Sequence, residues 1–392
     1  MDRDLHASVT AWRRHLHANP GLTLDEGATA AFVVEKLQSL GITEIETGIG
    51  GHGVVATLRR PQNGKGGGGQ GGNRSVGLRA DMDALPIQEA DETLPHRSRK
   101  PGVMHACGHD GHTAALLGAA ALLQADTSWS GTVRLVFQPA EEGGNGAVKM
   151  IADGLFERFP MDRIFGWHNW PGLPAGTVGV HEKAVMAAGA RFDITFDGHA
   201  GHAALPHMTK DPMIGAGHAI VALQSIVSRE VDPMKAGVVS ITMATSGEAQ
   251  NQVPARAVLK GTARWLDASV GDLIETRMAE IAHGIAAAFG LKATLNFNRG
   301  VPVTENHPEE RETAALAAAS VTQVVRGLPP AMTGEDFSWF LHNVPGAFVW
   351  IGNGPAENGR ELHHPSYDFN DDILPAASGF LAAVAKRALT ED

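Results

Sequence analysis

The amino-acid sequence predicts an α/β protein with a mostly parallel central sheet and a second, smaller domain inserted into its chain. Three observations lead to this prediction. The chain has 392 residues with 43% hydrophobic content, which is too long for one ordinary core. Its first 185 residues alternate helical and extended patterns, as parallel sheets require. From residue 188 the order of helical and extended patterns changes, and the alternation seen in the first 185 residues returns only near the C-terminus.

The early elements are read from the spacing of apolar residues. Residues 7–17 and 28–40 have helical spacing, and short apolar runs at 54–58, 76–80 and 133–137 are typical of buried strands. The run GKGGGGQGG at 64–72 lacks the Gly-Lys-Ser/Thr ending of a phosphate-binding loop, so we expect a flexible surface loop there.

The inserted domain is predicted from six consecutive elements. They are a strand at 191–196, a helix at 212–229, strands at 238–244 and 258–265, a helix at 270–288 and a strand at 292–298. This βαββαβ order is the ferredoxin-like arrangement. Helices at 309–325 and 373–389 then resume the first pattern. We therefore expect a discontinuous domain at 1–187 and 300–392, and an inserted domain at 188–299.

Composition limits the partners of the protein. The formal net charge is −11, from 43 acidic and 32 basic residues, which disfavours nucleic acid and anionic membrane surfaces. The first residues hold no apolar run like that of a signal peptide, and no segment has the roughly 18 apolar residues of a membrane span. We expect a cytoplasmic protein that binds small molecules or peptides. Cys107 is the single cysteine, so it acts as a thiol or thiolate.

The densest chemical signal is MHACGHDGH at 104–112, just before a helix expected to begin near Gly111. Thiolate and imidazole are the usual ligands of zinc and its neighbours in the periodic table. Cys107 and His109 are therefore candidate metal ligands. For His105 and His112 the alternatives stay open, because a histidine beside a helix more often caps it or meets solvent.

A second signal is VRLVFQPAEEGG at 133–144, where an apolar strand ends in two adjacent carboxylates. Consecutive side chains point in different directions, so one glutamate can bind metal while the other faces a water molecule. Hydrolysis at a metal needs both a ligand and a base that moves the water proton. The pair Glu141 and Glu142 suits this division, although a solvated pair is the commoner fate of such dipeptides.

Other donors follow later strands or turns. His168 closes the run RIFGWH, His363 and His364 precede a proline, and Asp81 and Asp83 follow the strand at 76–80. A carboxylate in that place can contact a metal-bound group or orient a ligand histidine.

The motifs of other enzyme classes are incomplete or absent in this chain. GIGGHG at 48–53 is followed by a strand-like run rather than the helix of a dinucleotide site. Gly-x-Ser-x-Gly and His-Glu-x-x-His are both missing from the sequence.

The motifs together resemble one family. RADMDALP, MHACGHDGHTAALLGAA, FQPAEEGG, WHNWP, GHAGHAALPH, NQVPARAVLKGTAR, GEDFSWF and LHHPSYDFND are similar, in that order, to the M20 metallopeptidases, and within them to aminoacylases, hippurate hydrolases and auxin-conjugate amidohydrolases. The resemblance implies a catalytic domain around a dinuclear metal site and a lid domain that forms dimers.

The resemblance also implies roles for individual residues. The metal ligands would be Cys107, His109, Glu142, His168 and His363. His363 is preferred to His364 because the family's histidine lies two residues before the proline. The catalytic residues would be the base Glu141, Asp83 behind the ligands, and His202 at the oxyanion, while Asn251 and Arg264 would bind substrate.

The implied activity is hydrolysis of an N-acyl amino acid to a carboxylate and a free amino acid. The alternatives are a dipeptidase or carboxypeptidase on the same fold, and a non-catalytic binding scaffold, which the intact Glu141 argues against. The family implies two divalent ions per subunit (Zn, Mn, Co or Ni) and a homodimer or higher oligomer through the lid. Two-zinc members carry histidine where this chain has Asp81, so its second ion has a different ligand set. The motifs leave the acyl group and the metal unassigned.

Overall fold

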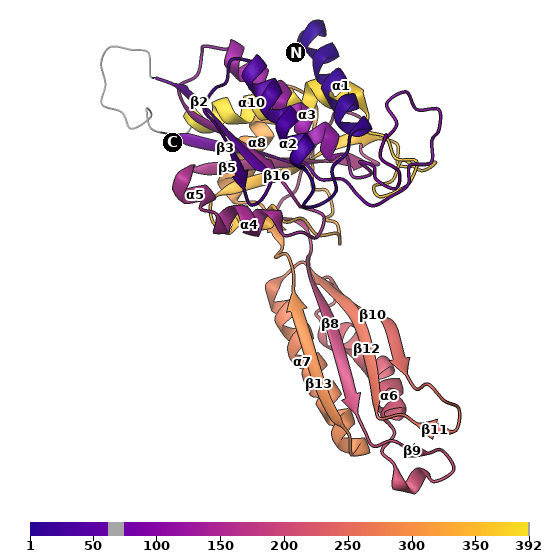
Figure 1. Cartoon of the computed structure of the whole chain (residues 1–392). Coiled ribbons are helices and arrows are strands. Elements are labelled where there is room, and N and C mark those ends of the chain that lie inside the picture. Colours follow the sequence, from indigo (N-terminus) through magenta and orange to yellow (C-terminus); the bar gives the residue numbers. More distant parts are fainter. Residues whose placement is uncertain (62–73, 391–392) are drawn as a thin grey trace. The chain divides into compact units, whose positions relative to one another are not determined.

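The computed structural model describes residues 1–61 and 74–390, which form two units (Figure 1). Unit 1 comprises Met1–Val185, Glu305–Pro329 and Asp336–Asp392, and unit 2 comprises Met186–Thr304 and Pro330–Glu335. Each unit has its own hydrophobic core. The glycine-rich loop expected at 64–72 lies outside the described residues.

Unit 1 is built on a mixed sheet with strand order β1-β2-β4-β3-β5-β16-β6-β15. Its strands are β1 (Ile45–Ile49), β2 (Gly53–Arg60), β3 (Ser75–Asp81), β4 (Gly131–Gln138), β5 (Arg163–Pro171), β6 (Val178–Val180), β15 (Val324–Arg326) and β16 (Gly346–Gly354). The central strands β4, β3, β5 and β16 all pair in parallel. The predicted α/β fold with a mostly parallel sheet is confirmed, and the apolar runs expected as strands are the buried β2, β3 and β4.

Helices cover both faces of this sheet. They are α1 (Arg3–Ala18), α2 (Gly27–Ser39), α3 (His109–Ala125), α4 (Gly146–Ala152), α5 (Leu155–Arg158), α8 (Pro308–Ala319), α9 (Ser338–Leu341) and α10 (Leu374–Thr390). Figure 1 shows α2, α3 and α10 on one side of the sheet and α4 and α5 on the other. Helix α3 is apolar on nearly all sides because it is buried between α1, α10 and the sheet.

Helix α10 is the one described helix that is long and apolar enough to cross a membrane. The stretch Asp371–Thr390, which begins with the short 3₁₀ helix η4 (Asp371–Ile373), is 61% buried inside the protein. It packs on α3, α8 and β3, as a core helix of a globular protein does.

Unit 2 has the βαββαβ order. Its elements are β8 (Ala188–Asp197), α6 (Pro212–Ser225), β10 (Gly237–Ser246), β12 (Arg256–Trp265), α7 (Ala268–Phe289) and β13 (Lys292–Arg299). The sheet order is β10-β12-β8-β13 and every neighbouring pair is antiparallel. Helix α6 continues as one π-helical turn, η3 (Ile226–Glu230). A hairpin of β9 (Gly201–His202) and β11 (Gln252–Val253) and the 3₁₀ helix η2 (Pro206–Met208) complete the unit, and β7 (Ala184–Met186) pairs with β14 (Thr304–Glu305).

Two expected boundaries differ from the structure. The helix expected at 309–325 ends at Ala319, and the residues Val324–Arg326 form β15, which pairs in parallel with β6. An alanine-rich helical pattern does not reveal this strand, because only tertiary pairing creates it. Helix α3 begins at His109 rather than near Gly111, since Gly108 supplies a left-handed residue (φ 96°) before the first turn.

Candidate metal centre

The carboxyl ends of β3, β4 and β5 bring the predicted metal ligands of unit 1 together. Such ends are where open α/β sheets hold their ligands. Asp83 follows β3, Glu141 and Glu142 follow β4, and His168 lies near the end of β5. Cys107 precedes α3, which packs on β3.

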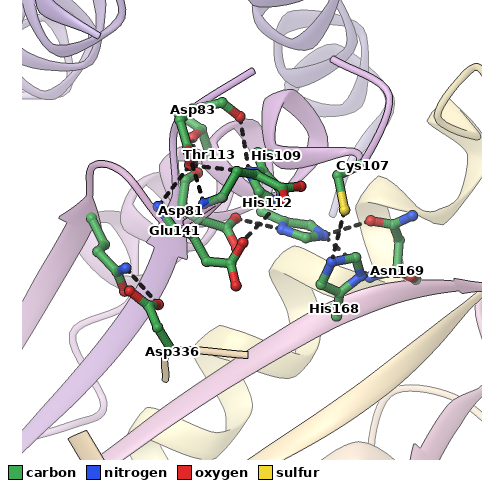
Figure 2. A network of polar contacts seen from close by, with 12 residues as sticks. Asp81, Asp83, Cys107, His109, His112, Thr113, Glu141, His168, Asn169 and Asp336 are labelled. Carbon is green, nitrogen blue, oxygen red and sulfur yellow. Dashed lines mark hydrogen bonds and ion pairs between the residues drawn. The ribbon is translucent and has the colours of Figure 1, made fainter. Parts of the chain in front are cut away.

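Cys107 lies between two histidines of the donor cluster, and Figure 2 shows it beside one of them, His168. Its Sγ is 3.4 Å from Nε2 of His168 and 3.3 Å from Nε2 of His363. The same His363 nitrogen is 3.0 Å from Oε1 of Glu142. His109 joins three sets of donor atoms that each lie within 4.8 Å of one another: one with Cys107 and His168, one with Glu141 and Glu142, and one with Asp81 and His112. All five predicted ligands therefore converge in unit 1.

The structure separates His363 from its neighbour His364. The backbone N–H of His363 donates to the carbonyl of Ala106 at 2.7 Å, and its left-handed conformation (φ 64°) directs the chain through the cluster. The ring of His364 is exposed and accepts a local hydrogen bond from the N–H of Ser366 at 3.1 Å. Only His363 therefore lies among the donors.

The chemistry of the cluster fits a divalent cation. His109 is fully buried, and its Nδ1 lies 2.9 Å from the carbonyl of Asp83. Its Nε2 has no hydrogen-bond partner among the described residues. A buried ring that is fixed through one nitrogen, and whose other nitrogen meets the Asp81 carboxylate only at 3.6 Å, is typical of a metal ligand. Sulfur, imidazole and carboxylate donors together suit zinc, cobalt, nickel or manganese.

The surroundings of the cluster favour the neutral forms of its thiol and of one imidazole. Burial and the carboxylates of Glu142 and Glu141 raise the pKa of the Cys107 thiol well above its usual range. Burial, together with the ring of His112, lowers the pKa of His168 well below its usual range. Binding of a cation reverses the effect on a thiol, because thiolate is the ligand form.

Asp83 connects the glutamate pair with the ligand histidine. Its carboxylate oxygens accept the backbone N–H groups of Glu141 at 3.1 Å and Glu142 at 2.9 Å, and the Thr23 hydroxyl at 2.7 Å. Its Oδ1 lies 3.4 Å from Nδ1 of His109. Burial alone would raise the pKa of Asp83, but these hydrogen bonds and the His109 ring lower it. Asp83 is therefore held ionised beside His109, one of the predicted ligands.

A second network lies under the cluster, around Asp81. This buried carboxylate accepts from Arg79 at 2.9 Å, and its Oδ1 is 2.6 Å from Nδ1 of His112. Nε2 of His112 is in turn 2.6 Å from Oδ1 of Asn169, whose amide donates to the Tyr367 hydroxyl at 2.6 Å. Both nitrogens of His112 thus have protein partners, and Figure 2 shows this ring beside Asn169 and His168. Sequence reasoning left His112 open and did not single out the other three partners of this network.

His105 and Asp110, from the same motif, lie in different surroundings. Both ring nitrogens of His105 are buried without a hydrogen-bond partner among the described residues, and burial lowers its pKa to about 4. Asp110 accepts from the ring of His17, at 2.8 Å, and belongs to a buried ion network with Arg13. Asp110 thus connects the first turn of α3 with His17 and Arg13 of α1.

The three remaining predicted residues lie in unit 2. His202 on β9 pairs with Gln252 on β11, and the carbonyl of Asn251 accepts the N–H of Ala203 at 2.9 Å, so His202 and Asn251 are neighbours. Arg264 stands on β12 opposite Gly189, at the other end of the sheet. Burial and Arg191 lower its pKa.

Comparisons with known proteins agree with this geometry. The profile described as "Peptidase family M20/M25/M40" matches residues 77–387. The chain is 41% identical over 389 residues to a hippurate hydrolase of Campylobacter jejuni, covering 98% of each chain. It is 39% identical over 390 residues to an N-acetyl-L-cysteine deacetylase of Bacillus subtilis, covering 98% of this chain and 89% of that protein. A crystal structure of a Bacillus subtilis protein, described as a dinuclear metal binding peptidase from the M20 family, superimposes with a TM-score of 0.87 at 34% identity, covering 100% of both chains.

Proposed function

The chain belongs to peptidase family M20/M25/M40 and is a metal-dependent hydrolase, and we propose that it cleaves the amide bond of N-acyl amino acids to give a carboxylate and a free amino acid. The observation that carries the proposal is the position of Glu141 in one donor set with His109 and Glu142, two of the five predicted ligands. The names of the relatives, a hippurate hydrolase and an N-acetylcysteine deacetylase, support the substrate class.

The proposed mechanism divides the work between two glutamates. A divalent cation held by Cys107, His109, Glu142, His168 and His363 would supply Lewis acidity toward water and the amide carbonyl. Glu141 takes the water proton at its carboxylate and passes it to the leaving nitrogen. Asp83 fixes the backbone of both glutamates, so that one side chain can serve as ligand and the other as base.

We propose two ions per subunit. Two donor sets, Cys107–His109–His168 and Cys107–Glu142–His363, share the cysteine, which supports a pair of adjacent ions. A thiolate favours zinc, cobalt or nickel, and the carboxylates also accept manganese. Asp81 already bonds Arg79 and His112, so we expect it to orient the centre rather than to hold the second ion. The enzyme is proposed to be cytoplasmic, where reducing conditions keep Cys107 available.

Unit 2 supports a homodimer as the active form. Along β12 and β8, Arg264 pairs with Gly189 and Arg256 pairs with Asp197, so the two ends of the sheet are eight register positions apart. At about 3.3 Å per residue this is roughly 26 Å, which exceeds the length of an N-acyl amino acid. One unit 2 cannot present His202 and Arg264 to the same substrate. Two copies can, and we propose that unit 2 is both the lid and the dimer interface.

The surface of unit 2 offers a suitable interface. Strand β10 is at the edge of the sheet, and exposed apolar side chains stand on it and on α6: Ile214 is 49% exposed, Val221 74% and Met243 54%. An edge strand flanked by apolar side chains is a ready surface for association with a second copy.

A substrate panel tests the proposed function. Hippurate, N-acetyl amino acids, indole-acyl amino acids and dipeptides are incubated with enzyme loaded with Mn, Zn, Co or Ni. We expect N-acyl amino acids to be hydrolysed and a chelator to abolish the activity. Glu141→Gln should lower kcat by about 10²- to 10⁴-fold with metal still bound, because it removes the base. Full activity of this variant, or of chelated enzyme, would contradict the mechanism, and a preference for dipeptides would favour the dipeptidase alternative.

A further inference from the structure

The turn that follows β4 has a strained backbone. Ala140, directly before the glutamate pair, is left-handed with φ 56°, a conformation that costs a residue with a Cβ about 1–2 kcal/mol. The turn persists because its three successive N–H groups are all bound by carboxylates. Glu141 and Glu142 donate to Asp83, and Ala140 donates to Oε1 of Glu26 at 2.9 Å. Successive N–H groups in such turns form natural anion-binding concavities.

Glu26 connects this turn to a second strained loop. The residue is fully buried at the start of α2, and the same Oε1 accepts the N–H of Leu24 at 2.8 Å. Leu24 is itself left-handed, with φ 70°. Its neighbour Thr23 donates to Asp83 at 2.7 Å and also approaches the carbonyl of Glu142, at 3.4 Å. Glu26 and Asp83 therefore hold the loop before α2 and the turn after β4 as one assembly.

We infer that Glu26 is a positioning residue for Glu141, and that its buried carboxylate keeps the Ala140 turn in the strained conformation that presents the catalytic base. The inference rests on the proposed function, since it assigns Glu26 a role through Glu141. Without that acceptor the buried N–H of Ala140 is unpaired, at a cost of about 1–3 kcal/mol. The turn then gains by relaxing out of the left-handed region, and a shift of about 1 Å in a catalytic group is enough to lower the rate about 10²-fold.

The metal ligands should be less sensitive to Glu26 than the base is. Four of the five proposed ligands, Cys107, His109, His168 and His363, come from other segments of the chain, and none of them is bonded to Glu26. The fifth, Glu142, lies one residue farther from Ala140 than Glu141 does, and its N–H keeps its own bond to Asp83 at 2.9 Å. Loss of Glu26 should therefore change kcat much more than metal content or KM. This pattern separates positioning of the base from a general loss of structure.

The test compares matched variants of the metal-loaded enzyme. Glu26→Leu should lower kcat about 10- to 100-fold, with KM within about 3-fold and metal content unchanged. Glu26→Gln should keep kcat within about 3-fold of wild type, because its amide oxygen can accept the same two N–H bonds. Glu310→Leu is the control for loss of a buried glutamate. Glu310 pairs with Arg163 at the opposite end of β5 from His168, so this variant should lower Tm but not kcat.

A double variant makes the role specific. Glycine adopts left-handed backbone without strain, so Ala140→Gly added to Glu26→Leu should recover part of the lost kcat. If Glu26→Leu does not fold, Glu26→Asp takes its place, because a side chain one methylene shorter cannot reach both N–H groups. The inference is overturned if Glu26→Leu and Glu310→Leu lose kcat equally. It is also overturned if the kcat of Glu26→Gln is as low as that of Glu26→Leu. Glu141→Gln separates the two proposals, since an active Glu141→Gln enzyme refutes the proposed base whatever the Glu26 variants do.

Discussion

The single cysteine lies buried among histidine donors, with its Sγ 3.4 Å from one imidazole and 3.3 Å from another. We predict that Cys107→Ser weakens metal affinity by about 10-fold or more, because a hydroxyl is a much poorer ligand than a thiolate for borderline metals. The metal-free protein should lose only about 1 kcal/mol of stability. Chelator competition measures the first effect and denaturation of metal-free protein measures the second.

Ala106→Ser provides the control for this experiment. It buries the same hydroxyl one residue away, at a fully buried position that is not among the donors. Its metal affinity should remain that of wild type. An unchanged affinity in Cys107→Ser would remove the cysteine from the ligand set.

The sequence revealed the residues that carry reactive groups in short motifs, and of the residues that hold them it indicated Asp83 but not the others. Cys107, His109 and Glu142 stand in dense or paired motifs. Glu26 is an acidic residue at the start of a helix, where the helix dipole favours negative charge. Its position in the sequence therefore does not indicate a further role. Asn169 and Tyr367 meet the Asp81 network from distant segments. No local pattern marks such partners, because only the folded sheet brings their segments together.

Within unit 1, helix α1 is held to its neighbours by a charged histidine, His17. Burial alone lowers the pKa of His17, but hydrogen bonds to Asp110 and Glu89 raise it to about 9, above the ordinary 6.5. The protonated ring therefore stabilises the fold fully below about pH 6.5, and this contribution disappears as the pH rises through 9. A shift from 6.5 to about 9 corresponds to about 3–4 kcal/mol.

The comparison of wild type with His17→Gln at two pH values checks this prediction. Denaturant unfolding should show a stability difference at about pH 6 that becomes smaller by about pH 9.5. His15→Gln is the control on the same helix. Burial lowers the pKa of His15, so the difference in stability between wild type and His15→Gln should not disappear at high pH. A His17→Gln effect that is constant with pH would show that the ring is neutral in the fold.

The start of α3 depends on a glycine for two reasons. Gly108 has φ 96°, and a Cβ there would lie 2.4 Å from Oδ1 of Asn169 and 2.8 Å from the hydroxyl of Tyr367. Gly102 also has positive φ, at 73°, but no atom lies within 4 Å of its added Cβ. We predict that Gly102→Ala costs about 1 kcal/mol, whereas Gly108→Ala costs about 1–3 kcal/mol more. Thermal unfolding and metal content measure the contrast, and equal losses in the two variants would contradict it.

Among the elements, long periodic helices and fully buried strands were predictable, and very short strands were not. Residues 3–18 and 268–289 carry enough turns to show their period, and β2, β3 and β4 are buried strands with mostly apolar residues. Strands β6 and β15 have three residues each, too few for any period. Their assignment depends on parallel pairing with each other, which arises only in the folded sheet.

At the level of the whole molecule, the proposed dimer can be tested on the exposed face of α6. Val221→Asp places a charge on a side chain that is 74% exposed, so it should leave the fold intact but oppose association. We predict a monomer by size-exclusion chromatography with light scattering, and loss of most activity. Leu316→Asp, on a side chain 42% exposed on α8 of unit 1, is the control and should stay dimeric and active. A dimeric Val221→Asp enzyme would place the interface elsewhere.

The order of strands in unit 1 has a consequence for synthesis of the protein. Strands β5 and β6 are consecutive along the chain, but β16, at Gly346–Gly354, lies between them in the sheet. On the ribosome, at about 5–20 residues per second, these two strands therefore wait on the order of ten seconds or more with unpaired edges. The contiguous βαββαβ elements of unit 2 emerge during that interval and can fold first. The nascent chain is thus most exposed to aggregation before its last central strand arrives, and that interval is where we expect a chaperone to act.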